Sequence, residues 1–170
     1  MKNFKLMHYI FTFFIDLSLT FYVNSVFSFV VADTQVLLYN DEEIPVTQIK
    51  HKDKVIIPYS DHYSAKIKEV QQIAYEGILY EIVVDGLFSV IASPDHLFLN
   101  KLYRPIQMHE LTIGSYISTQ NGFMQVTKKE ALEFSGLLYR LILEKESLNI
   151  LDLTLLTNGI VSCDNFLLNN

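Results

Sequence analysis

The feature that most constrains the fold is a series of short apolar runs separated by turn-forming dipeptides. Runs such as KVIIP at 54–58, ILYEIVV at 78–84 and FSVIA at 88–92 are rich in β-branched and aromatic residues, which favour strands. Their spacing of roughly ten residues predicts an all-β domain. Asp85-Gly86 predicts a tight hairpin between the second and third of these runs. Only residues 128–134 (KKEALEF) favour a helix, of one or two turns at most.

Two ordered pairs of segments resemble each other within the chain. Residues 44–55 align with 106–117 at an offset of 62, and residues 76–84 align with 135–143 at an offset of 59. Apolar positions coincide in both pairs. Two units are too few for a solenoid, so the pattern predicts one duplicated β unit closed by pseudo-twofold pairing. The alternative is chance similarity between apolar strands.

The first 32 residues have the composition of a targeting segment. Lys2 and Lys5 precede an almost continuously apolar run over residues 9–32, an order typical of a secretory signal peptide. The alternative is a membrane anchor, because such a run can span a bilayer. Asp16 favours the signal peptide, since a charge at bilayer depth costs about 2.5–3.5 kcal/mol. Both interpretations predict a secreted or membrane-anchored domain over residues 33–170.

Charge and cysteine content narrow the function classes. The formal net charge is −6, which argues against a nucleic-acid partner and against anionic membrane surfaces, so we expect membrane contact only through the N-terminal segment. The single cysteine, Cys163, cannot form an intrachain disulfide; it is either a buried apolar residue or a reactive thiol. The five histidines are scattered, so we expect no zinc site and no other cofactor.

The central segment FSVIASPDHLFL places Ser93 three residues before His96, between two apolar runs. This segment is similar to the T-x-x-H motif of the Hint family, the self-processing domains of inteins and hedgehog C-terminal regions, with Ser93 at the Thr position and His96 at the His position. The resemblance covers roughly residues 29–170 and implies the Hint fold. The segments that carry it follow the family's order: 32–38, 44–56, 88–99, 104–117 and 153–166.

The resemblance also implies a reaction, in which a Cys or Ser side chain attacks the carbonyl of its own preceding peptide bond. His96 would protonate the leaving nitrogen, and Ser93 would orient the scissile peptide. Asp95 would hydrogen-bond locally or raise the pKa of His96 by charge proximity. The family's Cys falls at Phe29, and Ser28, one residue earlier, offers only a weaker hydroxyl nucleophile. As a bare tetrapeptide, Ser-Pro-Asp-His also suits a simple type I turn.

The C-terminal end departs from the intein pattern, which closes with His-Asn. Asn170 would be the cyclising Asn and Asn169 would replace the His; no residue follows Asn170 in this sequence, so we do not expect full splicing. Cys163 would serve in a later trans-thioesterification, as in hedgehog-like processing.

Two functions follow from these features. The first is a Hint-type domain that cleaves the peptide bond before residue 28 or 29, with a sterol or another nucleophile as acceptor. We expect that activity to be degenerate, because the Cys is absent. The second is a non-catalytic β-module that binds a protein or lipid partner.

Overall fold

A computed structural model describes residues 28–59, 63–144 and 150–163. The all-β prediction is confirmed: the described residues form eleven strands in one strongly curled sheet, with three short 3-10 helices. In chain order the elements are β1 (Gln35–Leu37), β2 (Glu43–Pro45), η1 (Val46–Gln48), β3 (Lys54–Ile56), β4 (Ser64–Val84), β5 (Phe88–Ala92), β6 (Leu97–Leu99), β7 (Pro105–Gln107), η2 (Met108–Glu110), β8 (Tyr116–Thr119), β9 (Gly122–Leu143), η3 (Ile150–Leu153), β10 (Thr154–Thr157) and β11 (Ile160–Cys163).

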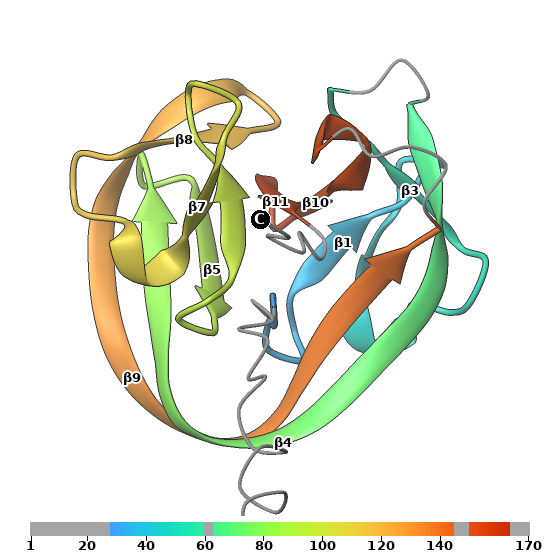
Figure 1. The fold of residues 1–170 in the computed structure, drawn as a ribbon, viewed down its shortest axis with the longest axis horizontal. Helices are drawn as coiled ribbons and strands as arrows, with labels where there is room; N and C mark the ends of the chain where they lie inside the picture. The colour runs from blue at the N-terminus through green and yellow to red at the C-terminus, as the bar shows by residue number, and fades with distance from the viewer. Residues whose placement is uncertain (1–27, 60–62, 145–149, 164–170) are drawn as a thin grey trace, which may run out of the picture.

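The long strands β4 and β9 pair along almost their whole length and curve together into a U-shaped wall (Figure 1). Their pairing shows the predicted pseudo-twofold axis. Glu76 pairs with Ser135, and these are the two residues that the 59-residue offset superposes. The flanking pairs are exchanged by the same rotation: Tyr75–Gly136 and Gly77–Phe134.

The two units repeat a strand, 3-10 helix and strand in the same order. The series β2, η1 and β3 in the first unit corresponds to β7, η2 and β8 in the second. Several apolar positions that coincide in the sequence alignment are buried in both units, so the duplication extends to the core. Among these twin positions are Val46 and Met108, Ile49 and Leu111, and Val55 and Ile117.

Two local predictions, one for a turn and one for a helix, had opposite outcomes. The predicted hairpin is confirmed, because Val84 pairs with Phe88 around Asp85 and Gly86, both at positive φ as a primed turn requires. The predicted helical turn at 128–134 is wrong: these residues lie in β9 and pair with β4. Cross-strand pairing over the whole of β4 outweighs the weak local helix preference of this stretch.

The residues just before Asp33 pack against the sheet. Val30 bridges to Ala92 and Tyr139, and both Phe29 and Val30 are buried. Residues 28–31 therefore pack against the domain, and the predicted division at Ala32 stays a prediction. Of the predicted targeting segment, 1–32, residues 1–27 lie outside the described residues. Within the described ranges, no helix has the length and apolar character needed to cross a membrane.

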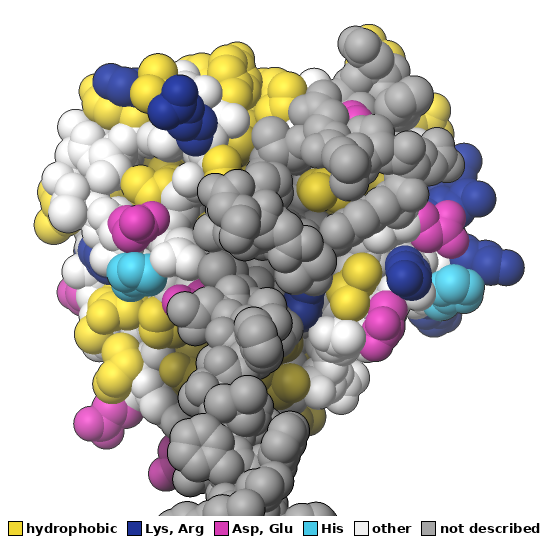
Figure 2. Space-filling view, in the orientation of Figure 1, with side chains coloured by type: hydrophobic (Ala, Val, Ile, Leu, Met, Phe, Trp, Pro, Cys, Tyr) yellow, Lys and Arg dark blue, Asp and Glu magenta, His cyan; other side chains and the backbone are white. Residues whose placement is uncertain are grey.

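The outer surface carries charges of both signs. On the face shown in Figure 2, Lys and Arg side chains lie near Asp and Glu side chains at the right of the view, and hydrophobic side chains are exposed mainly at the top and the left. Chain entry and chain exit meet between the two arms of the U, because β1 pairs with β10 and β11 pairs with β6 (Figure 1). This meeting point is where the candidate site lies.

Candidate functional site

The Ser-Pro-Asp-His segment is a turn that delivers one histidine to the interior. It connects β5 to β6, and the amide of His96 donates to the carbonyl of Ser93 at 3.0 Å. The backbone of His96 is fixed on its other side, because its carbonyl accepts from Met108 N at 2.8 Å. Its imidazole is buried and only 3% exposed. The predicted turn is therefore present, whereas the catalytic role of His96 stays a prediction.

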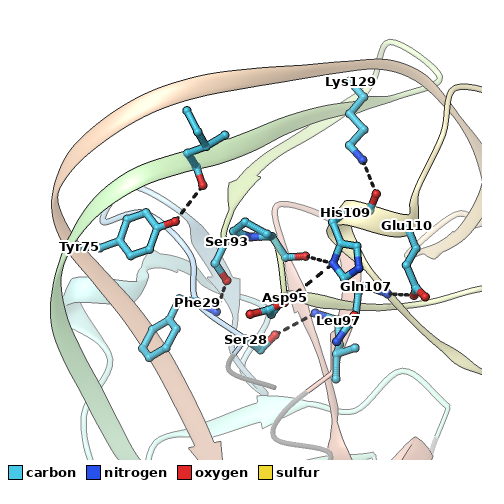
Figure 3. Close-up of polar contacts among 12 residues, drawn as sticks. Ser28, Phe29, Tyr75, Ser93, Asp95, Leu97, Gln107, His109, Glu110 and Lys129 are labelled. Atoms are coloured by element: carbon cyan, nitrogen blue, oxygen red, sulfur yellow. Dashed lines mark hydrogen bonds and ion pairs between the residues drawn. The ribbon is translucent and has the colours of Figure 1, made fainter. Parts of the chain in front are cut away.

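Ser28 lies directly against this imidazole. Its Oγ is 2.9 Å from His96 Nδ1 and accepts a hydrogen bond from Leu97 N at 3.1 Å (Figure 3 shows the latter contact). Phe29 points elsewhere and packs with Leu79 and Leu138. Successive residues of an extended chain face opposite sides, so only one of the two can meet His96. The structure brings Ser28 to that position, whereas the sequence alignment had put Phe29 there.

Ser93 holds the backbone that follows Ser28. Its Oγ accepts from Phe29 N at 3.3 Å, and its own amide donates to Phe29 O at 3.0 Å (Figure 3). This two-way clamp fixes the chain one residue after Ser28. The position agrees with the predicted orienting role of Ser93.

The second ring nitrogen of His96 contacts residues that the sequence analysis missed. His96 Nε2 lies 3.0 Å from Ser162 Oγ, which in turn contacts Thr157 Oγ1. Both hydroxyls are buried on the terminal β10–β11 hairpin. In the sequence both residues lie in 153–166, a segment that resembles the Hint family, but that resemblance does not indicate which of its side chains meets His96.

Burial determines the charge of His96. Desolvation lowers the pKa of His96 from 6.5 to about 3, and a hydrogen bond with the backbone of Phe29 opposes this only in part. The imidazole is therefore neutral at pH 7 and has one unprotonated nitrogen, but the low pKa makes it a weaker base than an exposed histidine. The predicted rise of the His96 pKa through Asp95 is wrong. The Asp95 carboxylate is exposed and lies 3.9 Å from His109 Nδ1, so its contact is local (Figure 3).

The remaining candidates have weaker links to the site. Cys163 borders the same small cavity as Ser28 and His96, but it packs in a cluster with Leu97 and Leu99. It follows Ser162 on β11, so the two side chains face opposite sides of the strand. This favours the buried-cysteine interpretation. Asn169 and Asn170 lie outside the described residues. Within the described ranges, no group of three or more His, Cys, Asp and Glu residues could hold a metal ion.

Comparisons with known proteins identify the fold. No protein-family model and no curated protein sequence matches the chain. Among solved structures, a variant of the Ssp DnaB mini-intein superposes with a TM-score of 0.71 at 11% identity, covering 85% of this chain and 98% of that one. A bacterial intein-like domain from Clostridium thermocellum gives 0.69 at 17% identity, covering 81% and 99%. The gp41-1 intein gives 0.65 at 17% identity, covering 80% and 98%. The predicted Hint fold is therefore confirmed.

Proposed function

We propose that this Hint-fold domain cleaves its own Phe27–Ser28 peptide bond by an N-to-O acyl shift. Ser28 is the nucleophile, and His96 carries the proton. The observation that supports this most directly is the 2.9 Å contact between Ser28 Oγ and His96 Nδ1 in a buried site. No cofactor is needed, because the bond broken belongs to the residue that attacks it.

The proposed step balances as follows. Ser28 Oγ attacks the carbonyl carbon of Phe27, and its hydroxyl proton passes to His96. The bond between that carbon and Ser28 N then breaks, and His96 returns the proton to the leaving nitrogen. The product is an ester that joins the Phe27 carbonyl to Ser28 Oγ, with a new α-amino group on Ser28. Water or an added nucleophile then cleaves the ester and releases residues 1–27.

Three features of the site favour a serine in this role. The imidazole is neutral at pH 7 and keeps a lone pair towards the hydroxyl, and its pKa of about 3 means that it holds the proton only transiently. The amide of Leu97 donates to Ser28 Oγ and stabilises negative charge as it develops there. The clamp between Ser93 and Phe29 holds the backbone beside the reacting bond, which reduces the entropy cost of reaching the reactive geometry.

Because Ser28 rather than Phe29 faces His96, the absence of a cysteine at residue 29 does not leave the site without a nucleophile. The sequence alone suggests a degenerate site, because Phe29 cannot attack a carbonyl. With Ser28 beside His96, the site has a nucleophile, but a hydroxyl reacts more slowly than a thiol. We therefore propose slow cleavage that an added nucleophile accelerates. The released product, residues 1–27, would carry most of the segment 1–32 that the sequence predicts to be a signal peptide or anchor.

The test uses the full chain with an N-terminal affinity tag, incubated with and without hydroxylamine and analysed by mass spectrometry. We expect a tagged fragment that ends at Phe27 as a hydroxamate, and a partner fragment that begins at Ser28. A hydroxamate distinguishes this reaction from hydrolysis by a contaminating protease. Ser28→Ala should abolish the fragment. Ser28→Cys should cleave faster and should also respond to dithiothreitol.

A matched variant tests the register. Phe29→Cys places the same thiol one residue later, where the side chain packs against Leu79 and Leu138, so it should not cleave at residue 29. If neither the unmodified chain nor Ser28→Cys yields a fragment, the self-cleavage proposal is wrong and the non-catalytic β-module is favoured. Cleavage in Phe29→Cys but not in Ser28→Cys would place the nucleophile at residue 29.

A further inference from the structure

The imidazole of His96 belongs to a continuous chain of buried hydrogen bonds that ends on the backbone. Ser28 Oγ contacts His96 Nδ1 at 2.9 Å, and His96 Nε2 contacts Ser162 Oγ at 3.0 Å. Ser162 Oγ contacts Thr157 Oγ1 at 2.5 Å, and Thr157 Oγ1 donates to Ile160 O at a long 3.5 Å. The four polar side chains are all at most 7% exposed.

The two backbone ends give this chain a direction. At one end Leu97 N can only donate, and it donates to Ser28 Oγ. At the other end Ile160 O can only accept. Thr157 therefore directs its hydrogen to that carbonyl and accepts the hydrogen of Ser162. Ser162 then accepts the hydrogen on His96 Nε2, and the bare Nδ1 accepts the hydrogen of Ser28.

The opposite direction satisfies fewer groups. It would place the ring hydrogen on Nδ1, and Ser28 Oγ would accept it with its second lone pair while the first accepts from Leu97 N. The hydroxyl hydrogen of Ser28 would then have no acceptor in any contact that the described residues make with it. A buried donor without an acceptor costs free energy, so the first direction is favoured.

We infer that Ser162 and Thr157 are positioning residues that hold His96 in the tautomer with its hydrogen on Nε2, leaving Nδ1 as the proton acceptor for Ser28. The role in cleavage rests on the function proposed above, whereas the tautomer itself does not. A base needs its lone pair on the nitrogen that faces the nucleophile. The wrong tautomer would present a donor to Ser28 and could not remove its proton.

A purely structural role for the two hydroxyls is the competing explanation. Ser162 is the only polar residue of β11, where its neighbours Val161 and Cys163 are buried. An apolar residue at 162 would suit such a strand equally well in packing terms. A hydroxyl there needs a partner to be tolerated, and the partners it has are His96 Nε2 and Thr157. The contact with His96 therefore explains a serine at this position of an apolar strand better than packing does.

The tautomer can be measured without any cleavage. We propose recording long-range nitrogen–hydrogen correlation spectra of the full chain labelled with ¹⁵N histidine, with His96→Gln to assign His96 among the five histidines. The chemical shifts distinguish a protonated ring nitrogen from a bare one. We expect Nε2 to be protonated and Nδ1 bare at pH 7. A spectrum with the hydrogen on Nδ1 would overturn the inference, whether or not the chain cleaves.

Variants link the tautomer to the reaction. Ser162→Ala should give a mixture of tautomers and slow the hydroxylamine-dependent cleavage by about tenfold, the effect of losing one orienting hydrogen bond. Ser162→Thr keeps the hydroxyl and should restore both the single tautomer and the cleavage rate. Thr157→Val should change both quantities in the same direction as Ser162→Ala, but by less. The control is Ser118→Ala, which removes another buried serine hydroxyl, one bonded to Tyr59.

The possible results separate the two proposals. An unchanged tautomer in Ser162→Ala refutes the positioning role, even if that variant cleaves slowly through a general loss of stability. A protonated Nε2 in a chain that never cleaves, even as Ser28→Cys, refutes the proposed function and leaves the tautomer inference intact. Equal slowing in Ser118→Ala and Ser162→Ala with no change of tautomer would assign the effect to packing.

Discussion

Acid should destabilise this domain through one buried imidazole. His96 has a pKa of 6.5 in the unfolded chain, and burial lowers it to about 3 in the folded chain. Between these values the unfolded chain binds a proton that the folded chain excludes. Stability is therefore fully present above pH 6.5 and falls as the pH drops towards about 3, because protons then favour the unfolded state.

The size of the effect follows from the same two pKa values. Each pH unit within the window is worth about 1.4 kcal/mol. Lowering the pH from 7 to 5 should therefore remove about 2 kcal/mol of the free energy of unfolding through His96 alone. That is a substantial part of the free energy of unfolding of a typical domain, which is about 5–15 kcal/mol. Carboxylates contribute to acid unfolding as well, so the His96 part must be isolated by subtraction.

Urea unfolding at pH 7 and pH 5 provides the assay. The chain has ten Tyr and no Trp, so tyrosine fluorescence reports the transition. His96→Gln removes the titrating group, and its loss between the two pH values should be about 2 kcal/mol smaller than that of the unmodified chain. His109→Gln removes an exposed imidazole and should keep the full loss. Equal pH dependence in the unmodified chain and His96→Gln would refute the reasoning.

Three further measurements test the packing and its link to the site. Gly159→Ala should cost about 2–3 kcal/mol in urea unfolding, because a Cβ there would lie 2.5 Å from Phe88 Cε1 at a φ of +76°; Gly86→Ala, at φ +70° with open space, should cost only about 1 kcal/mol. Met108→Ala should cost about 2–5 kcal/mol, whereas Leu102→Ala, exposed by 64%, should stay within about 0.5 kcal/mol. The rate of hydroxylamine-dependent cleavage should follow the folded fraction through the urea transition; cleavage that persists in unfolded chains would contradict the proposed site.

The parts of the fold that sequence could predict are those set by local chemistry or by internal repetition. Asp85-Gly86 dictates its own hairpin, because both residues accept positive φ. The twin positions Val46 and Met108 share an apolar character that reflects equivalent burial in the two units. The Ser93 and His96 pair could be found because a known motif carries it in a strand context.

The parts that could not be predicted depend on register between distant segments. The strand state of 128–134 is imposed by pairing with β4, which no local window contains. Whether Ser28 or Phe29 faces His96 is a one-residue difference that reverses the side of the strand, and a weak alignment cannot resolve it. Ser162 and Thr157 lie in the last segment of the family resemblance, 153–166, but their contact with His96 depends on how the terminal hairpin pairs with β6 and β1.

The site joins the segments where the chain enters the duplicated unit, passes between its halves and leaves it. Ser28 lies 68 residues before His96, and Ser162 lies 66 residues after it. Ser162 reaches the ring through the pairing of β11 with β6, and Thr157 is placed by the pairing of β10 with β1. Contacts this distant in sequence form only after the intervening loops have closed. A base with the correct tautomer would therefore exist only in the completed domain, so the geometry that would cleave the chain is also what delays cleavage until folding is finished.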